Sequence, residues 1–419
     1  MDLIQDLEDR GLLFQVTDRE GLNAALEQQS ITLYCGFDPT ADSLHVGNLL
    51  QIIILKRFQD AGHRPIALVG GGTGLIGDPS GRSSERQLNE QGIVKDWGMK
   101  LKDQLSRFLN FTEGDNRALL ANNYDWLGKM SLISFLRDIG KHFPITYMLS
   151  KDSVTSRMEA GISYTEFSYM MLQAYDYLNL FEQEGARLQI GGSDQWGNIT
   201  AGLELIRRSN HEKQAFGLTM PLITNSDGQK LGKSMGNGIW LDPEKTTPYE
   251  FYQFWINTDD RDVIRFINYF TFLPKEEIAE LEKEVEVAPE HRIAQKRLSE
   301  ELTAFVHGEE ALRQAIKITD ALFSGDIKSL SAADIRQGFK DVPTYKSEEK
   351  GDISLVDLIV MAGVTPSKRQ AREDIQNGAI YINGERQTDV NYVTTKKDRI
   401  EGYYLLVRRG KKKYTLIQY

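Results

Sequence analysis

Short apolar runs alternate with amphipathic stretches along the first half of the chain. The runs that predict buried strands are Ile31–Phe37, Pro65–Gly71 and Arg187–Gly191. Apolar residues at helical spacing predict helices over Leu49–Ala61, from about Ser84 to Phe111, and from near Asp194 to Arg208. This order of strands and helices predicts an α/β fold with a doubly wound parallel sheet, whose binding sites lie at the carboxyl ends of the strands.

From Pro248 to about Phe323 the pattern becomes wholly helical. Apolar residues recur three or four apart in Tyr249–Trp255, Asp260–Phe270, Lys275–Glu286 and His291–Val306. Residues 324–351 are poorer in apolar side chains and contain proline, which predicts a linker. We therefore expect an α/β domain over 1–247, a helical domain over 248–323, the linker, and a small mixed domain over 352–419.

Composition limits the picture further. A chain of 419 residues exceeds the usual size of one hydrophobic core, so several domains are expected. The N-terminus lacks the basic head and apolar core of a signal peptide, and no apolar run approaches the roughly 20 residues of a transmembrane helix. The single cysteine, Cys35, excludes an internal disulfide and a cysteine-rich zinc site. We expect a cytoplasmic protein.

Charge is distributed unevenly along the chain. The net charge is −10, but Lys340–Tyr419 contains 15 lysines and arginines against 11 aspartates and glutamates, a net of +4, so the rest carries −14. A basic tail on an acidic body is compatible with RNA binding, because counterion release acts at the contact surface. A merely solvated C-terminus explains the charge equally well.

Three polar segments have the composition of phosphate sites, although each also has an ordinary explanation. His45-Val-Gly-Asn48 opens the first helix, whose N-terminus suits phosphate, yet a lone histidine at a helix start is usually structural. The glycine-rich segment Gly70–Arg82 matches neither the dinucleotide fingerprint nor the P-loop, and it could be a tight turn. Within and after it, Asp78 is a candidate for an ammonium group, and Arg82 and Arg86 are candidates for phosphate.

The third segment is Lys230-Leu-Gly-Lys233-Ser234, in a polar stretch flanked by glycine. Two lysines three residues apart on a loop suit a departing polyphosphate. An isolated pair of lysines is more often a solvated surface. The interpretation therefore depends on the other segments.

Together the segments resemble a class I aminoacyl-tRNA synthetase, and the sequence between them resembles tyrosyl-tRNA synthetase of the bacterial type. His45–Asn48 is similar to the first signature of the class, usually His-Ile-Gly-His, and Lys230–Ser234 to the lysine-rich second. Tyr34–Thr40, Tyr164–Asp176 and Gly191–Asn198 look like the family's amino-acid and ribose segments. The resemblance covers essentially the whole chain, and it implies a Rossmann-like catalytic domain, a helical domain and an S4-like RNA-binding domain.

The resemblance implies roles for individual residues. Tyr34 and Asp176 would hydrogen-bond the substrate phenol, and buried polar groups left unpaired by phenylalanine would select tyrosine, a selection for which the family it resembles is the standard example. The groups around the substrate ammonium and carboxylate would be Asp78, Tyr169, Gln173 and Gln195. Tyr169, Gln173 and Asp176 also fall on one face of a helix, although a packed face with incidental polar groups would show the same spacing.

The ATP site is implied in the same way. The nucleotide would contact Cys35, Gly36, Asp38, Gly47, Gly192, Asp194 and Lys233. The catalytic groups around the phosphates would be Thr40, His45, Asn48, Arg82, Arg86, Lys230 and Lys233. The substrate carboxylate attacks the α-phosphate directly, so catalysis would come from positioning and charge stabilisation. Mg²⁺ would accompany ATP without a dedicated protein site, and no tightly bound cofactor or resident metal is expected.

The sequence shows three departures from the family pattern. Asn48 replaces the second histidine of the first signature, so it can donate a hydrogen bond but cannot titrate. Leu231-Gly232 replaces Met-Ser in the second signature, and Arg82 stands where many relatives have lysine. None of these changes removes a required charge.

The basic C-terminus resembles an S4-type RNA-binding module, with its helix-turn-strand core at Ser367–Gly384. The candidate contacts with tRNA(Tyr) are Arg207, Arg208, Lys368, Arg369, Arg372, Arg408, Arg409, Lys411, Lys412 and Lys413. The family is homodimeric, and the apolar segment Ser131–Asp138 is a candidate interface.

Three rival functions remain open at this stage. Tryptophanyl-tRNA synthetase shares the fold and signatures, but Tyr34 with Asp176 favours a phenol over an indole. An RNA-binding regulatory protein with a degenerate catalytic half would have no need of the retained His45 and Lys230. A small-molecule nucleotidyltransferase would leave the S4-like tail without a role.

Overall fold

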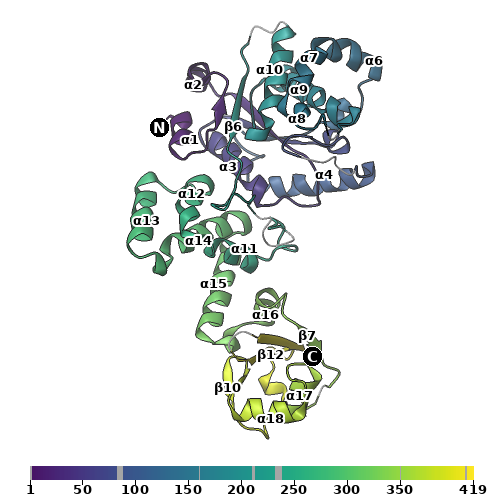
Figure 1. The fold of residues 1–419 in the computed structure, drawn as a ribbon. Helices are drawn as coiled ribbons and strands as arrows, with labels where there is room; N and C mark the ends of the chain where they lie inside the picture. The colour runs from purple at the N-terminus through teal and green to yellow at the C-terminus, as the bar shows by residue number, and fades with distance from the viewer. Residues whose placement is uncertain are drawn as a thin grey trace. The chain divides into compact units, whose positions relative to one another are not determined.

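The computed structural model describes residues 2–82, 88–159, 161–209, 213–231, 238–349, 351–410 and 413–419. These residues form two compact units (Figure 1), one of residues 1–245 with 258–294, the other of residues 246–257 with 295–419. Each unit is described by itself below. In the part of the chain that the structure describes, no helix is both long and apolar enough to cross a membrane.

The first unit is built on a six-stranded sheet in the order β1-β6-β5-β2-β3-β4. Its strands are β1 (Gln15–Val16), β2 (Thr32–Phe37), β3 (Arg64–Val69), β4 (Leu119–Asn122), β5 (Ala186–Gly192) and β6 (Phe216–Met220). All neighbours pair in parallel except β1, which runs antiparallel to β6 at the edge. The predicted parallel α/β sheet is therefore confirmed.

Helices cover both faces of this sheet, α3 and α4 on one and α9 and α10 on the other (Figure 1). The helices between the strands are α3 (Val46–Asp60), α4 (Gln91–Leu105), α5 (Tyr124–Leu127), α6 (Leu132–Ser134), α7 (Ile145–Leu149), α8 (Asp152–Thr155), α9 (Tyr164–Glu184) and α10 (Trp196–Arg208). Because α3 leaves β2 toward one face and α10 leaves β5 toward the other, the carboxyl ends of these two adjacent strands form a topological switch point. Ligands bind at such points in open α/β sheets.

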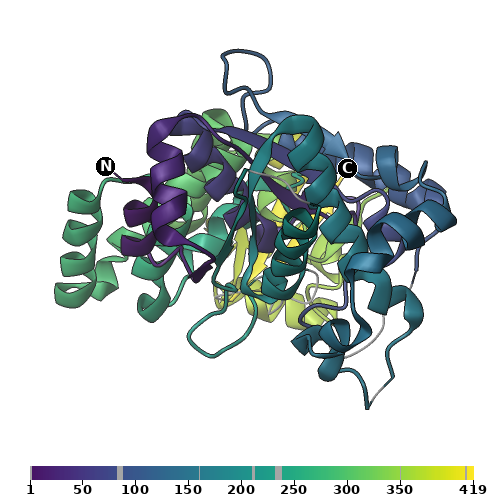
Figure 2. The same ribbon diagram turned by 90° about the horizontal axis from the view of Figure 1, so that it is seen from above.

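The remaining helices of this unit flank α3 and the sheet edge. They are α1 (Leu3–Asp9), α2 (Arg19–Gln28), α12 (Asp260–Phe270) and α13 (Lys275–Val287). Helices α1 and α2 lie side by side (Figure 2) and are joined by the Arg19–Glu8 ion pair. On α3, the buried Arg57 donates to Asp6 and to the Thr271 carbonyl.

The helix expected from Ser84 to Phe111 is shorter in the structure, where α4 covers Gln91–Leu105. Residues 83–87 lie outside the described part of the chain. After the helix ends, Phe108 and Leu109 are still buried, and the Gln59 side chain holds the backbone of Asn110 through its carbonyl and its N–H. The apolar pattern in the sequence therefore extends beyond the end of the helix, because Phe108 and Leu109 are buried without being helical.

The second unit combines α-helices with a five-stranded sheet in the order β10-β9-β12-β13-β7. Its helices are α11 (Pro248–Ile256), α14 (Ile293–His307), α15 (Glu309–Ser324), α16 (Ala332–Gly338), α17 (Leu355–Met361) and α18 (Lys368–Gln376). Its strands are β7 (Thr344–Lys346), β8 (Ile353–Ser354), β9 (Ile380–Ile382), β10 (Glu385–Gln387), β11 (Val393–Thr394), β12 (Tyr404–Arg409) and β13 (Lys413–Gln418). The helix, the turn at Gly378 with φ 65°, and β9 form the helix-turn-strand expected over Ser367–Gly384.

The compact units do not coincide with the domain boundaries expected from the sequence. The helices expected as one domain are divided, since α12 and α13 belong to the first unit and α11, α14 and α15 to the second. The segment expected as a linker contains α16 and β7, and its Ile335 and Phe339 are buried in one cluster with Ile318 and Leu406. The segment contains few apolar residues, so its sequence did not predict a buried core. The residues that pack against Ile335 and Phe339 lie on distant segments of the chain.

Candidate active site

A cavity of about 380 Å³ opens at the switch point between β2 and β5. It lies wholly within the first unit. The structure brings together on its wall seventeen of the residues that the sequence singled out: Tyr34, Cys35, Gly36, Asp38, Thr40, His45, Gly47, Asn48, Asp78, Arg82, Tyr169, Gln173, Asp176, Gly192, Asp194, Gln195 and Lys230. Arg86 and Lys233, predicted with them, lie outside the described residues.

One end of the cavity presents a phenol and a carboxylate from opposite elements. Tyr34 projects from the buried strand β2 and Asp176 from α9, and both are almost completely buried. The Tyr34 hydroxyl has no hydrogen-bond partner among the residues that the structure describes. Both oxygens of Asp176 are held, by Asn123 Nδ2 at 2.8 Å and by Trp126 Nε1 at 2.7 Å. A buried hydroxyl without a partner is costly, so this end suits a ligand with its own hydroxyl.

Burial controls the ionisation of this end. Desolvation raises the pKa of the Asp176 carboxyl to about 8, although the hydrogen bonds from Asn123 and Trp126 oppose the shift. Desolvation also raises the pKa of the Tyr34 phenol well above its ordinary value, and the nearby Asp176 charge adds to this effect. Tyr34 therefore remains a neutral donor and acceptor over the physiological range.

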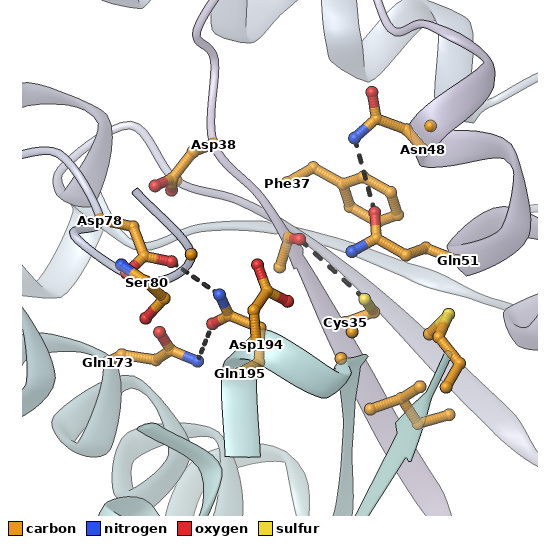
Figure 3. Close-up of a pocket in the computed structure, with 18 of the residues that line it drawn as sticks. Cys35, Phe37, Asp38, Asn48, Gln51, Asp78, Ser80, Gln173, Asp194 and Gln195 are labelled. Atoms are coloured by element: carbon orange, nitrogen blue, oxygen red, sulfur yellow. Dashed lines mark hydrogen bonds between the residues drawn. The ribbon is translucent and has the colours of Figure 1, made fainter. Parts of the chain in front are cut away.

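A row of amides and carboxylates lines the middle of the cavity (Figure 3). Gln195 Nε2 donates to Asp78 Oδ2 at 2.7 Å, and Gln173 Nε2 donates to Gln195 Oε1 at 3.2 Å. Asn198 Nδ2 completes the row by donating to Gln173 Oε1 at 2.9 Å. The row places the Asp78 carboxyl group beside the oxygens of side-chain amides, so it suits an ammonium ligand.

Tyr169 is turned toward a second carboxylate. Its hydroxyl donates to Asp38 Oδ2 at 2.8 Å, and the other Asp38 oxygen accepts from Thr73 Oγ1 at 2.7 Å. Asn123 donates to Thr73 Oγ1 as well as to Asp176. One hydrogen-bonded network thus connects Asp38 with the phenol end.

The opposite end of the cavity is formed by the start of α3. His45 is the N-cap residue, and its Nδ1 accepts from the Gly47 N–H at 2.9 Å. With Nδ1 occupied as an acceptor, a neutral imidazole carries its proton on Nε2, which is then a donor. The Asn48 Oδ1 accepts from the His45 backbone N–H at 3.2 Å, so the residue that departs from the family signature completes a capping box.

Gly47 permits this arrangement sterically. A Cβ atom at Gly47 would lie 2.6 Å from His45 Cε1, so any side chain there would displace the imidazole. The backbone before and at the helix start is fixed from a distant segment, because Val46 N donates to Ile239 O and Leu241 N to Leu44 O. The Trp240 ring meets the His45 ring edge-on, with centroids 6.1 Å apart.

Cationic groups approach this end from two loops. Lys230 and Arg82 are exposed side chains that line the cavity. Asp194 lies between them and the amide row; burial raises its pKa, the Asp78 charge raises it further, and the Lys230 charge opposes the rise. Exposed cations around an open cavity suit a polyanionic ligand such as a triphosphate.

The wall between the two ends is made of backbone and small groups. A Cβ atom placed on Gly36 would have no described atom within 4 Å, so the space beside this residue is open. At Gly192 a Cβ would lie 2.6 Å from Asp194 Oδ1, so glycine is needed for that carboxylate to fold back. Burial raises the pKa of the Cys35 thiol to about 12, which makes it an unreactive neutral contact.

The candidate tRNA-binding residues differ in their exposure and in whether they already form ion pairs. Arg207 and Arg208 both bind the carboxylate of Glu204, and Arg208 also donates to the His142 carbonyl. Lys368, Arg369 and Arg372 are exposed on α18. Arg409 is paired with Asp374 at 2.8 Å, the guanidinium of Arg408 lies 3.8 Å from the Tyr381 ring centre, and Lys413 is exposed. Lys411 and Lys412 lie outside the described residues.

The sequence interpretation missed four polar residues of the site, namely Thr73, Asn123, Trp126 and Asn198. Asn123 follows β4, a strand that the apolar pattern did not predict, so its place at a carboxyl strand end was hidden. Asn198 lies within the Gly191–Asn198 segment that the sequence did single out, and its spacing from Asp194 and Gln195 on one helical start was a usable signal.

The fold and the cavity are those of a class I tRNA synthetase. The family model of tRNA synthetases class I (W and Y) matches residues 26–324, and that of the tyrosine–tRNA ligase SYY-like C-terminal domain matches residues 334–417. The chain is 65% identical over 419 residues to a tyrosine–tRNA ligase of Bacillus caldotenax and 64% identical to that of Geobacillus stearothermophilus, and all of each chain is covered.

Solved structures agree with this class. A C-terminally truncated mitochondrial tyrosyl-tRNA synthetase of Aspergillus nidulans superposes with a TM-score of 0.70 at 32% identity, covering 77% of this chain and 94% of its own. A tryptophanyl-tRNA synthetase of Encephalitozoon cuniculi, at 13% identity and a TM-score of 0.54, shares the fold alone. The chain belongs to the tyrosine–tRNA ligase family of class I aminoacyl-tRNA synthetases.

Proposed function

We propose that this ligase forms tyrosyl-adenylate and pyrophosphate from L-tyrosine and ATP, and then transfers tyrosine to the 3′ end of tRNA(Tyr). The observation that carries the substrate assignment is the buried hydroxyl of Tyr34 near Asp176, which has no hydrogen-bond partner among the described residues. The substrate phenol would donate to Asp176 and accept from Tyr34. Phenylalanine would form neither hydrogen bond, and it would leave the buried Tyr34 hydroxyl unsatisfied.

The activation step needs no protein nucleophile. A carboxylate oxygen of tyrosine bonds to the α-phosphorus of ATP, the bond to the bridging oxygen breaks, and pyrophosphate leaves with its electrons. Asp78, Gln173 and Gln195 would hold the amino acid in line, while Cys35, Gly36, Gly192 and Asp194 would place the nucleotide. His45 Nε2, Thr40, Arg82 and Lys230 would donate to the charge that develops on the phosphates.

Mg²⁺ would accompany ATP into this site. When bound with ATP, the cation would supply positive charge in addition to that of Arg82 and Lys230. The exposed position of Arg82 and Lys230 leaves the phosphate end open to solvent and to a hydrated ion.

The test of this function is ATP–pyrophosphate exchange on the full-length chain, with tyrosine, tryptophan and phenylalanine compared at equal concentration. We expect exchange with tyrosine alone. Stimulation by tryptophan would overturn the substrate assignment, and absence of exchange with all three would overturn the activity itself.

The basic face of α18 would contact tRNA. Its exposed Lys368, Arg369 and Arg372 are compatible with phosphate contacts. Replacing these three with alanine should raise the KM for tRNA several-fold, on the order of the loss expected from three phosphate contacts, and leave exchange unchanged. A matched control replaces Lys283, Lys296 and Arg313, three exposed basic residues on other helices. An equal effect of the two triple variants would contradict the α18 contact.

We also propose a homodimer that works in the cytoplasm, where its tRNA is available. Within the predicted interface Ser131–Asp138, Leu132 and Ile133 are 70% and 71% exposed, and Leu136 is also exposed. Exposed apolar side chains gathered in one segment are typical of an interface. Light scattering of the parent chain and of Ile133→Asp tests the dimer: a monomeric parent would contradict it.

A further inference from the structure

An ion pair outside the cavity, between the buried Asp262 and the partly exposed Arg265, binds the loop that carries Lys230. Residues 223–231 form a hairpin in which Thr224 and Lys230 face each other as antiparallel bridge partners. The Leu231 N–H donates to the Ile223 carbonyl, and the Asn225 N–H to the Gln229 carbonyl. Lys230 is therefore fixed by whatever fixes Thr224 opposite it.

That support comes from the first turns of α12. Asp262 is 2% exposed, and its Oδ2 accepts from both the backbone N–H and the hydroxyl of Ser226, at 2.9 and 3.0 Å. Its Oδ1 accepts from Arg265 Nη2. The same Arg265 nitrogen donates to the Thr224 carbonyl at 2.7 Å. The pair thus holds the hairpin at Thr224 and at Ser226.

Ordinary helix capping does not account for this carboxylate. The N-cap of α12 is Asp259, which accepts from the Arg261 N–H. An acid at the position of Asp262 commonly returns to the N-cap backbone, yet both of its oxygens are used on Ser226 and Arg265. The desolvation cost of this buried carboxylate is offset by its charge-assisted hydrogen bonds, two of which go to the hairpin at Ser226.

We propose that Asp262, with Arg265, is a positioning residue for Lys230 in the activation step. This inference rests on the proposed function of the cavity, and it adds a support that acts from outside it. Neither residue lines the cavity, so neither touches the substrates. Their effect reaches the reaction through the hairpin: a misplaced Lys230 ammonium would stabilise the leaving pyrophosphate less well.

The test is a double-mutant cycle by ATP–pyrophosphate exchange on the full-length chain. Asp262→Asn keeps the shape but presents an NH₂ either to Ser226 or to Arg265, both of which donate to Asp262, so the support of the hairpin loses a contact. It should lower kcat roughly tenfold, because an ångström of misplacement costs up to about 10²-fold. The KM for tyrosine should stay within about twofold, since the phenol end is untouched. In the Lys230→Ala background the further loss should be below about twofold.

Two further variants complete the cycle. Arg265→Gln removes the contact with Thr224 from a partly exposed side chain, and it should lower kcat in the same direction, again only when Lys230 is present. Asp227→Asn, on the exposed side of the same hairpin where it meets Arg261, should leave exchange unchanged. Thermal melts identify any variant that fails to fold, in which case Arg265→Gln decides.

The outcomes separate the two proposals. An equal fold-loss from Asp262→Asn with and without Lys230, a parallel rise in the KM for tyrosine, or full activity would overturn the positioning role. Absence of tyrosine-dependent exchange in the parent chain would instead overturn the proposed function.

Discussion

The two ends of the cavity differ in how deeply their polar side chains are buried. At the phenol end, Tyr34 and Asp176 are buried on a central strand and a long helix, and Asn123 and Trp126 hold the carboxylate from behind. At the phosphate end, His45 is exposed at a helix start. Lys230, also exposed, projects from a hairpin.

This difference matches what each end must recognise. Tyrosine differs from phenylalanine by one hydroxyl group. A site distinguishes the two well only where its own polar group is buried, because water cannot then replace the missing hydroxyl as a hydrogen-bond partner. Phosphate charge moves during the reaction, so its partners act best as donors aimed at the transition state. Burial therefore gives selectivity at one end, and oriented exposed donors give rate at the other.

The largest expected effect is at the phosphate end. His45→Ala should lower kcat for pyrophosphate exchange about 10²-fold and leave the KM for ATP within about twofold, because Nε2 acts on developing charge. The variant also loses a helix cap, which costs about 1 kcal/mol. His45→Asn is the control, since asparagine restores the cap and the melting temperature, whereas its shorter amide leaves kcat low. If His45→Ala raised the KM for ATP as much as it lowered kcat, His45 would contribute to ground-state binding, and the proposed difference between the two ends would be wrong.

A smaller effect, about tenfold, is expected from pH at the phenol end. The folded pKa of Asp176 is raised to about 8 by burial, so its ionisation opposes folding: the favourable contribution is present below the unfolded pKa and is lost as pH rises through 8. Tyrosine needs the ionised carboxylate as acceptor. Its KM should therefore fall about tenfold between about pH 7 and about pH 9, as the ionised fraction of Asp176 rises.

Two variants isolate the group responsible for this pH dependence. Asp176→Asn should bind tyrosine weakly and show a flat KM profile, whereas Tyr34→Phe, which keeps the carboxylate, should keep the slope. A flat profile in the parent enzyme would contradict the assignment to Asp176.

The smallest expected effect tests whether the Tyr34 hydroxyl lacks a partner in the ligand-free enzyme. Because its hydroxyl is buried without a described partner, Tyr34→Phe should raise the free energy of unfolding of the ligand-free enzyme by about 1 kcal/mol. The same change should narrow the preference for tyrosine over phenylalanine by several-fold, roughly the value of one neutral hydrogen bond. Denaturant melts and exchange kinetics measure the two quantities. A loss of stability would mean that the hydroxyl already has a partner in solution.

Local pattern in the sequence was enough for a good part of this molecule. The buried runs at β2, β3 and β5 and the helical spacing of α3, α10 and α12 predicted those elements, because a short apolar run indicates a buried strand and a period of 3.6 residues indicates a helix. The same holds for the residues at the carboxyl ends of β2 and β5. Once the sheet is parallel, Asp38 and Asp194 must meet at one edge.

Tertiary structure decided what depends on partners far apart in the chain. The orientation of Asp176 rests on Asn123 and Trp126, the burial of Phe339 rests on Leu406, and the placement of Lys230 rests on Asp262. A sequence window contains only one side of each of these contacts. Periodicity therefore reveals which face of an element is buried, but only the folded chain shows which distant group satisfies it.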